Sequence, residues 1–229
     1  MKRQDLYFAI VMLAIFLPFF LSADLYDWYK TFNADHAMVM AFLKFGILAT
    51  LGEMLGCRIS TGNYTTPNFG VIPRMVVWGI LGMGISMAMT VFSAGIPAFI
   101  AGMGGENLVA AFATNGFSWG KLAVAFSISV AMNTIFAPVF MTFHKITDAH
   151  IAENGGKIKA LFTPIAMRRQ MVSLNWDRQW SFIFKKTIPL FWYPAHTITF
   201  MLPGELRVLF AALLGVALGV ILAIGARKK

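Results

Sequence analysis

Long apolar stretches recur along almost the whole chain, and this recurrence limits the possible folds more than any other feature. A helix needs about 20 predominantly apolar residues to cross the hydrocarbon core of a bilayer. Six candidate segments run from Leu6 to Ser22, Ala37 to Gly56, Met75 to Ile96, Lys121 to Phe143, Thr187 to Pro203 and Leu206 to Ala226. With 58% hydrophobic and only 13% charged residues, the 229-residue chain is too apolar for a soluble domain. The sequence therefore predicts an all-α, polytopic transmembrane helical bundle of about six spans.

The whole chain, residues 1–229, is expected to form a single membrane domain. Its predicted parts are an extra N-terminal helix over residues 6–22, a helical core over 37–143, a cytoplasmic or interfacial loop over 144–186, and a C-terminal broken segment and helix over 187–226. The first apolar segment follows a charged start and resembles a signal peptide, but Leu21 is a poor residue for cleavage before Ala23. We interpret the segment as a retained helix, in a prokaryotic plasma membrane.

The fifth segment, Thr187 to Pro203, is short and interrupted by three prolines, so it either crosses the membrane or re-enters on the same side. The distribution of Lys and Arg distinguishes these alternatives, because cytoplasmic loops are enriched in both residues. Six crossings place 15 basic residues inside and 3 outside, whereas a re-entrant fifth segment gives 13 and 5. This count favours six spans with both termini in the cytoplasm.

Basic and aromatic residues alternate in the loop before the fifth segment. The residues concerned are Arg168, Arg169, Trp176, Arg178, Trp180, Phe182, Phe184, Lys185 and Lys186. Tryptophan and basic side chains together suit the headgroup layer of a membrane. The net charge of +9 is therefore attributed to topology and to anionic lipid headgroups at this inner loop, with the lipid bilayer and not nucleic acid as the partner.

Two charged residues lie within the second segment. Lys44 and Glu53 are nine residues apart, so they point to opposite faces of a helix and are not simple partners. Lys44 either extends outward along its stem or faces a polar cavity. Glu53 forms a structural ion pair, with Arg58 or with a cation of another helix, or it serves a pore or proton-handling role.

Polar residues and helix breaks coincide in the fourth and fifth segments. Asn133 precedes Pro138, which removes a helical hydrogen bond and predicts a kink. His196 and Thr197 follow Pro194 and predict a polar strip in the fifth segment. Asn133 is either an interhelical clamp or part of a pathway, and His196 is either a packing residue or a titratable gate.

The sequence offers little support for a metal site or an enzyme. His144 and Asp148 share a helical face, but His150 falls almost opposite, and we therefore predict no metal site there. The single cysteine, Cys57, excludes an internal disulfide. Because no nucleotide loop, zinc-protease signature or nucleophile elbow is present, neither a cofactor nor a catalytic residue is predicted.

Small residues recur every fourth position in the last segment. They are Ala211, Gly215, Gly219 and Ala223. Such a stripe allows a neighbouring backbone to approach closely. The expected neighbour is another helix of the same chain, and the alternative is a second copy or a membrane partner.

Three groups of residues resemble the Mpv/PMP-type family of small integral membrane proteins, found in the mitochondrial inner membrane and in peroxisomes. Gly52 and Glu53 are similar to the family's Gly-Asp, and Asn133 with Phe136-Ala137-Pro138 is similar to its Gln before Phe-Ala-Pro. The third group resembles its C-terminal series and consists of Trp192, Pro194, Phe200, Pro203 and Arg207. The resemblance covers residues 37–229 and implies a channel-like role or a role in small-molecule homeostasis.

From these residues we expect a small polar pathway, channel-like or transporter-like, for a small solute or ion. The pathway candidates are Lys44, Glu53, Asn133, His196 and Thr197, with Pro138 and Pro194 as the helix breaks. The alternative is a non-transporting membrane scaffold or assembly subunit, in which the same polar groups hold helices together.

Overall fold

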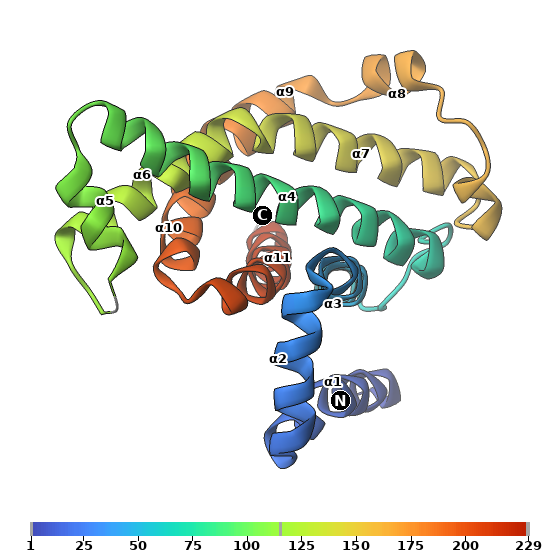
Figure 1. Cartoon of the computed structure of the whole chain (residues 1–229). Coiled ribbons are helices and arrows are strands. Elements are labelled where there is room, and N and C mark those ends of the chain that lie inside the picture. Colours follow the sequence, from blue (N-terminus) through green and yellow to red (C-terminus); the bar gives the residue numbers. More distant parts are fainter. Residues whose placement is uncertain (1, 115, 228–229) are drawn as a thin grey trace.

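The structure is a computed structural model that describes residues 2–114 and 116–227, without the side chains of residues 222, 223 and 225–227. The predicted small-residue position Ala223 is thus outside the described side chains, as are Lys228 and Lys229. The described residues form helices and no strands, as the sequence predicts (Figure 1).

The chain contains these helical elements in order: α1 (Arg3–Leu21), α2 (Ala23–Asp35), α3 (Ala37–Thr61), α4 (Val71–Gly102), α5 (Glu106–Ala113), α6 (Trp119–Ile135), α7 (Ala137–Glu153), the 3₁₀-helix η1 (Ile158–Leu161), α8 (Met167–Ser173), α9 (Trp176–Arg178), the π-helix η2 (Gln179–Trp192), α10 (Tyr193–Met201) and α11 (Gly204–Arg227).

Four helices are long and apolar enough to cross a membrane: α1, α3, α4 and α11 over Gly204–Ile221. A fifth crossing arises if α6 and α7 together form one bent span. These apolar helices are compatible with an integral membrane protein. Whether η2 and α10 make a sixth crossing stays a prediction.

Both predicted proline breaks coincide with changes in helix geometry. The fourth segment divides at Phe136 into α6 and α7, which meet at a bend of 46° just before Pro138. In the fifth segment, the π-helix η2 changes to the α-helix α10 next to Pro194. A proline lacks the backbone N–H that would continue the helical ladder, which explains why the hydrogen-bond pattern changes at these points.

The core lies where α3 packs against α4 and α11, and where α6 packs against α10. Its most buried side chains include Phe45 of α3, Ile128 of α6 and Phe200 of α10. Within this core Ala211 of α11 is buried, and Gly219 of the same helix approaches the backbone of Gly52. At these two positions the small-residue stripe serves packing within the chain, as expected.

Replacing Gly52 tests the tightness of the contact between α3 and α11. A Cβ atom at Gly52 would lie 2.9 Å from the backbone Cα of Val216, so α11 would have to move. We expect Gly52→Ala to lower the free energy of unfolding by about 1–3 kcal/mol, the usual range for overpacking. Reversible denaturation in mixed micelles measures the change. A Cβ at Gly84 of α4 meets no atom within 4 Å, so Gly84→Ala is the control, and equal destabilisation by both variants would contradict the tight contact.

The first helix contributes no buried residue to the core, although its Phe16 packs against it, and the helix is attached at its start. Asp5 accepts two hydrogen bonds from the Arg58 side chain, at 2.7 and 2.9 Å, and Phe8 stacks on Tyr64 with ring centroids 4.8 Å apart. Burial and a hydrogen bond to Asp5 raise the pKa of Tyr64. Arg58 therefore anchors α1 and is not the partner of Glu53.

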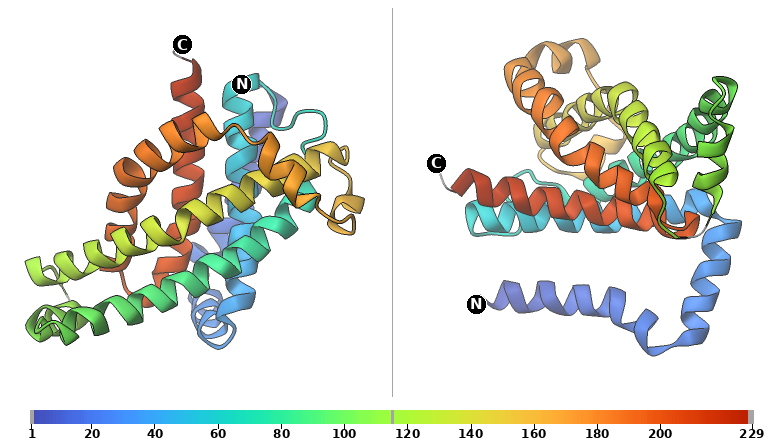
Figure 2. Two further views of the ribbon diagram at one scale, coloured as in Figure 1. Left: turned by 90° about the horizontal axis from the view of Figure 1, so that it is seen from above. Right: turned by 90° about the vertical axis from the view of Figure 1, so that its left-hand side faces the viewer.

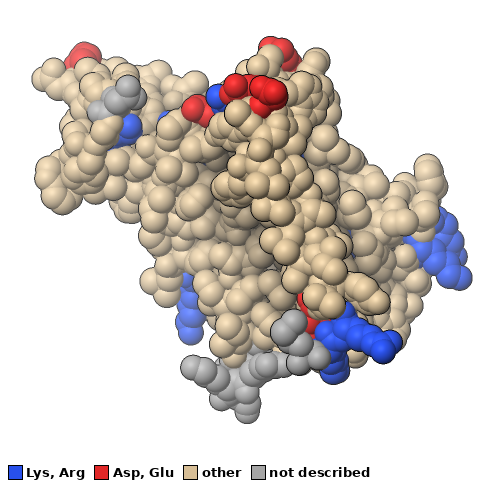
Figure 3. All heavy atoms as spheres, turned by 90° about the horizontal axis from the view of Figure 1, so that it is seen from below, with Lys and Arg blue, Asp and Glu red and all other residues tan. Residues whose placement is uncertain are grey.

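The described parts of the two chain ends lie at the same end of the molecule, as Figure 2 shows in both views. On the face shown in Figure 3, charged side chains lie near the edges and a broad uncharged surface lies between them. Such a surface is compatible with a lipid environment.

Candidate functional site

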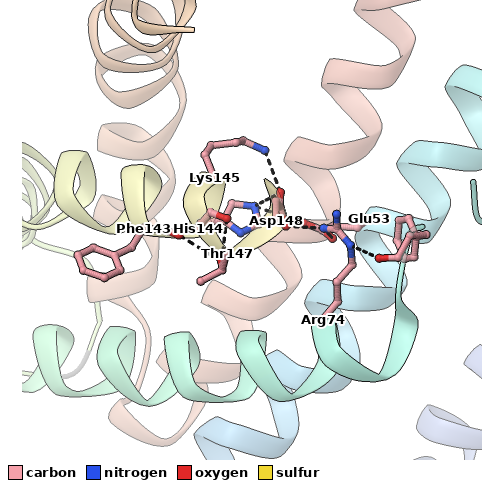
Figure 4. A network of polar contacts seen from close by, with 8 residues as sticks. Glu53, Arg74, Phe143, His144, Lys145, Thr147 and Asp148 are labelled. Carbon is pink, nitrogen blue, oxygen red and sulfur yellow. Dashed lines mark hydrogen bonds and ion pairs between the residues drawn. The ribbon is translucent and has the colours of Figure 1, made fainter. Parts of the chain in front are cut away.

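An ion cluster joins α3, α4 and α7 near one end of the helical core (Figure 4). Arg74 of α4 is central to it, because its Nη1 lies 2.5 Å from Glu53 Oε2 and 2.5 Å from Asp148 Oδ1. His144 Nε2 lies 3.3 Å from Glu53 Oε1 and 3.5 Å from Asp148 Oδ2, and Lys145 Nζ lies 3.3 Å from the same Asp148 oxygen. Of the two readings of Glu53, the geometry gives an ion pair with a cation of another helix.

Local structure explains why these side chains meet. His144 and Asp148 are four residues apart on α7 and therefore share one face of that helix. Arg74 lies in the first turn of α4, where its Nε donates to the Phe69 carbonyl at 2.7 Å. The guanidinium is thus fixed before it bridges the two carboxylates, and this planar, multiply bonded arrangement suits arginine.

The cluster contains three groups with metal-ligating atoms, Glu53, His144 and Asp148, within 4.8 Å of one another. However, the Arg74 guanidinium already contacts both carboxylates and supplies the positive charge that a metal ion would bring. His150 does not join the group, since its Nε2 pairs with the carbonyl of Ala160 at 3.0 Å. We interpret the group as an ion-pair cluster.

Asn133 and His196 form a second polar group between α6 and α10. The Asn133 Nδ2 and Oδ1 atoms lie 2.9 and 3.1 Å from His196 Nδ1, so either tautomer of the histidine finds a partner. Asn133 Nδ2 also donates to the Ser129 carbonyl at 2.8 Å. Both side chains are buried. The two residues that the sequence selected separately are therefore direct partners.

The remaining two pathway candidates lie elsewhere. The Thr197 hydroxyl donates to the Tyr193 carbonyl at 2.6 Å and so stabilises the start of α10. The Lys44 ammonium donates to the side chain of Asn33 in α2 and lies 5.1 Å from the centre of the Tyr29 ring. Neither residue lines the cavity that the other candidates share.

A cavity of about 230 Å³ connects the ion cluster with the Asn133–His196 pair. Its walls come from α3, α4, α6, α7, η2, α10 and α11. Glu53, His144, Asn133 and His196 all contribute to the lining. Most of the remaining surface is apolar and aromatic, including Phe45, Trp78, Phe136, Phe140 and Trp192.

Because Gly215 of α11 has no side chain, part of the cavity beside it stays open. Gly215 lines the cavity, and a Cβ built on it meets no atom within 4 Å. This position of the small-residue stripe therefore differs from Gly219, where a Cβ would lie 3.3 Å from the Gly52 carbonyl oxygen. Gly215 thus borders a cavity instead of a closely packed helix.

The sequence missed three features of the site. Arg74 had entered only the charge count, because nothing local to it indicates partners 21 and 74 residues away. Two Trp–His contacts were also missed, between Trp78 and His144 and between Trp192 and His196, with ring centroids 4.4 and 4.9 Å apart. Comparison of the chain with protein-family models, curated proteins and solved structures found no match. The site is therefore interpreted from its own geometry.

Proposed function

We propose that this chain is a membrane protein that passes a small solute through the cavity between its helices, as a channel-like or transporter-like protein. The observation that carries the proposal is the shared cavity of about 230 Å³, which is lined by Glu53 and His144 from the ion cluster and by Asn133 and His196 deeper in the core. Ionisable and hydrogen-bonding groups inside a membrane domain are costly and usually serve function.

The arrangement of the helix breaks supports the same proposal. The bend before Pro138 and the change from η2 to α10 at Pro194 lie in the two segments that carry Asn133 and His196. Broken helices next to a binding site in the membrane are typical of transporters. The Mpv/PMP-type resemblance, a prokaryotic plasma membrane and cytoplasmic termini remain parts of this proposal.

Solute flux into liposomes that contain the purified protein tests the proposal. We expect flux above that of empty liposomes, and we expect His196→Ala and Glu53→Gln to change it because both side chains line the cavity. Ser127→Ala is the control, since Ser127 is only half-buried, does not line the cavity, and donates its described hydrogen bond to the carbonyl of Ala123 in its own helix. Absence of flux for ions and small solutes, or the same flux in all variants, would contradict the proposal.

A scaffold without transport is the second candidate function. The observation that favours it is the direct contact between Asn133 and His196, which joins α6 to α10 in the manner of an interhelical clamp. Binding of anionic lipid at the basic loop and binding of a partner at α11 are proposed for the scaffold as well as for the transport function. Flux assays distinguish the two functions, because a scaffold produces none.

The clamp itself gives a prediction for stability. Asn133→Ala removes the partner of His196 Nδ1 and the donor to the Ser129 carbonyl, and both groups are buried. A buried polar group left without a partner costs about 1–3 kcal/mol. We therefore expect this loss in the free energy of unfolding, measured in mixed micelles. Ser127→Ala should change it by less than about 0.5 kcal/mol, and a similar value for Asn133→Ala would contradict the clamp.

A further inference from the structure

The size of the cavity limits what it accepts. At about 230 Å³ it is smaller than the roughly 300–1,000 Å³ of sites for drug-sized ligands. It is larger than an engineered apolar cavity of about 150 Å³ that binds benzene. A molecule with one or two rings therefore matches the available space.

The charges near the cavity are already paired with each other. Both oxygens of Glu53 have cationic or imidazole neighbours, and Arg74 bridges two carboxylates. A charged ligand would have to disrupt these pairs, or it would lose its hydration without gaining an ionic partner. Either change is costly in a low-dielectric interior. A neutral ligand avoids this cost.

Two aromatic residues of the walls, Trp78 and Trp192, carry hydrogen-bond donors that lack partners among the residues described. In both residues the donor is the indole Nε1 atom, which is buried. His196 uses Nδ1 to contact Asn133, so its Nε2 remains for a ligand in the part of the chain described. An unpaired buried donor favours any ligand that brings an acceptor oxygen.

The packing of α11 indicates how such a ligand gains access. This helix packs along α3 and contacts α10, but within the described range it makes no comparable contact with α7 or η2. Gly215, Leu218 and Gly219 of α11 nevertheless line the cavity together with Ile183 of η2. The side between α11 and η2 is thus the less closely packed one, and it is the expected route of access.

We propose that the cavity binds a small, neutral, aromatic molecule that carries a hydroxyl or carbonyl oxygen. This inference rests on the proposed function and names the class of its substrate. The rings of the ligand pack among Phe45, Phe136 and Phe140, and its oxygen bonds to a tryptophan N–H or to His196. A hydrated ion is excluded as the preferred ligand, because the cavity surface is mostly apolar.

Binding of 2-naphthol to the purified full-length protein in lipid nanodiscs tests the inference, with empty nanodiscs subtracted. Isothermal titration calorimetry should give saturable binding with one site. Gly215→Leu, which fills the cavity, should weaken the affinity at least tenfold, whereas Gly84→Leu, at an open position outside the cavity lining, should leave it within twofold. The charged analogues 2-naphthalenesulfonate and 2-naphthyltrimethylammonium should bind at least tenfold more weakly than 2-naphthol.

Recognition of the oxygen is tested separately with a double variant, Trp78→Phe with Trp192→Phe. This variant keeps an aromatic ring at both positions and removes both N–H donors. It should weaken 2-naphthol binding about threefold to tenfold, which is the range for the loss of one hydrogen bond. The binding of naphthalene, which has no oxygen, should stay unchanged. Absence of saturable binding, equal affinity in Gly215→Leu and the wild type, or preference for a charged analogue would overturn the inference. Flux without naphthol binding would overturn only the ligand class, whereas binding without flux would retain the site and overturn the transport proposal.

Discussion

Arg74→Met is expected to lower the free energy of unfolding by about 3–5 kcal/mol, the usual cost of removing one partner from a buried ion pair. The loss is large because Arg74 contacts both Glu53 and Asp148, whose charges would remain near each other without a cation between them. Only 12% of the Arg74 side chain is exposed. Reversible denaturation in mixed micelles measures the effect.

A matched control is available on the surface. Arg169 pairs with Glu153 at 2.6 Å, but 67% of the Arg169 side chain is exposed. Exposed pairs contribute about 0–1 kcal/mol, so Arg169→Met should have little effect. Combining Arg74→Met with Glu53→Gln and Asp148→Asn should restore most of the lost stability, because no buried carboxylate remains without a cation and the Lys145 ammonium that loses Asp148 is 46% exposed. Equal effects of the two single arginine variants would contradict a buried cluster.

The second large effect is expected for Gly215→Leu in solute flux. The leucine side chain extends into the open space beside Gly215 and occupies much of the cavity, so flux through the protein should fall at least tenfold. Protein stability should change little, since a Cβ at this position meets no atom. Liposome flux and unfolding are measured on the same preparation.

Gly84→Leu is the matched control for this prediction. Gly84 also lies in a long apolar helix and also has open space beside it, but it does not line the cavity. We expect its flux to equal that of the wild type. Equal flux in the wild type, Gly215→Leu and Gly84→Leu would show that solute does not pass through this cavity.

The helices that the sequence predicted best are those with a purely local signal. Apolar composition over about 20 residues is sufficient to locate α1, α3, α4 and α11, and Pro138 marks the break between α6 and α7. The extent of the fifth segment was less predictable. Continuous helical structure begins with α9 at Trp176 and runs on through η2, before the predicted start at Thr187. No local signal indicated this, because the charged residues Lys185 and Lys186 of η2 interrupt the apolar pattern.

The partners within the site depended on tertiary structure. Asn133 and His196 were selected as polar residues in apolar segments, yet their contact spans 63 positions of the chain and has no local signature. The same is true of Asp148, which the sequence connected only with His144 and His150. Lys44 was placed among the pathway candidates because of its charge, and the fold of α2 brings Asn33 to it instead.

Accessibility of position 215 to thiol reagents tests the central claim most directly, namely that solute reaches a cavity inside the bundle. Cys57 is the only cysteine, so Gly215→Cys with Cys57→Ser provides a single reactive thiol beside the cavity. Ala125→Cys in the same background is the buried control, because Ala125 is 0% exposed and does not line the cavity. The account predicts that a small thiol reagent modifies position 215 in the folded protein, that 2-naphthol slows this reaction, and that position 125 stays unmodified. Position 215 remaining as unreactive as position 125 would contradict it.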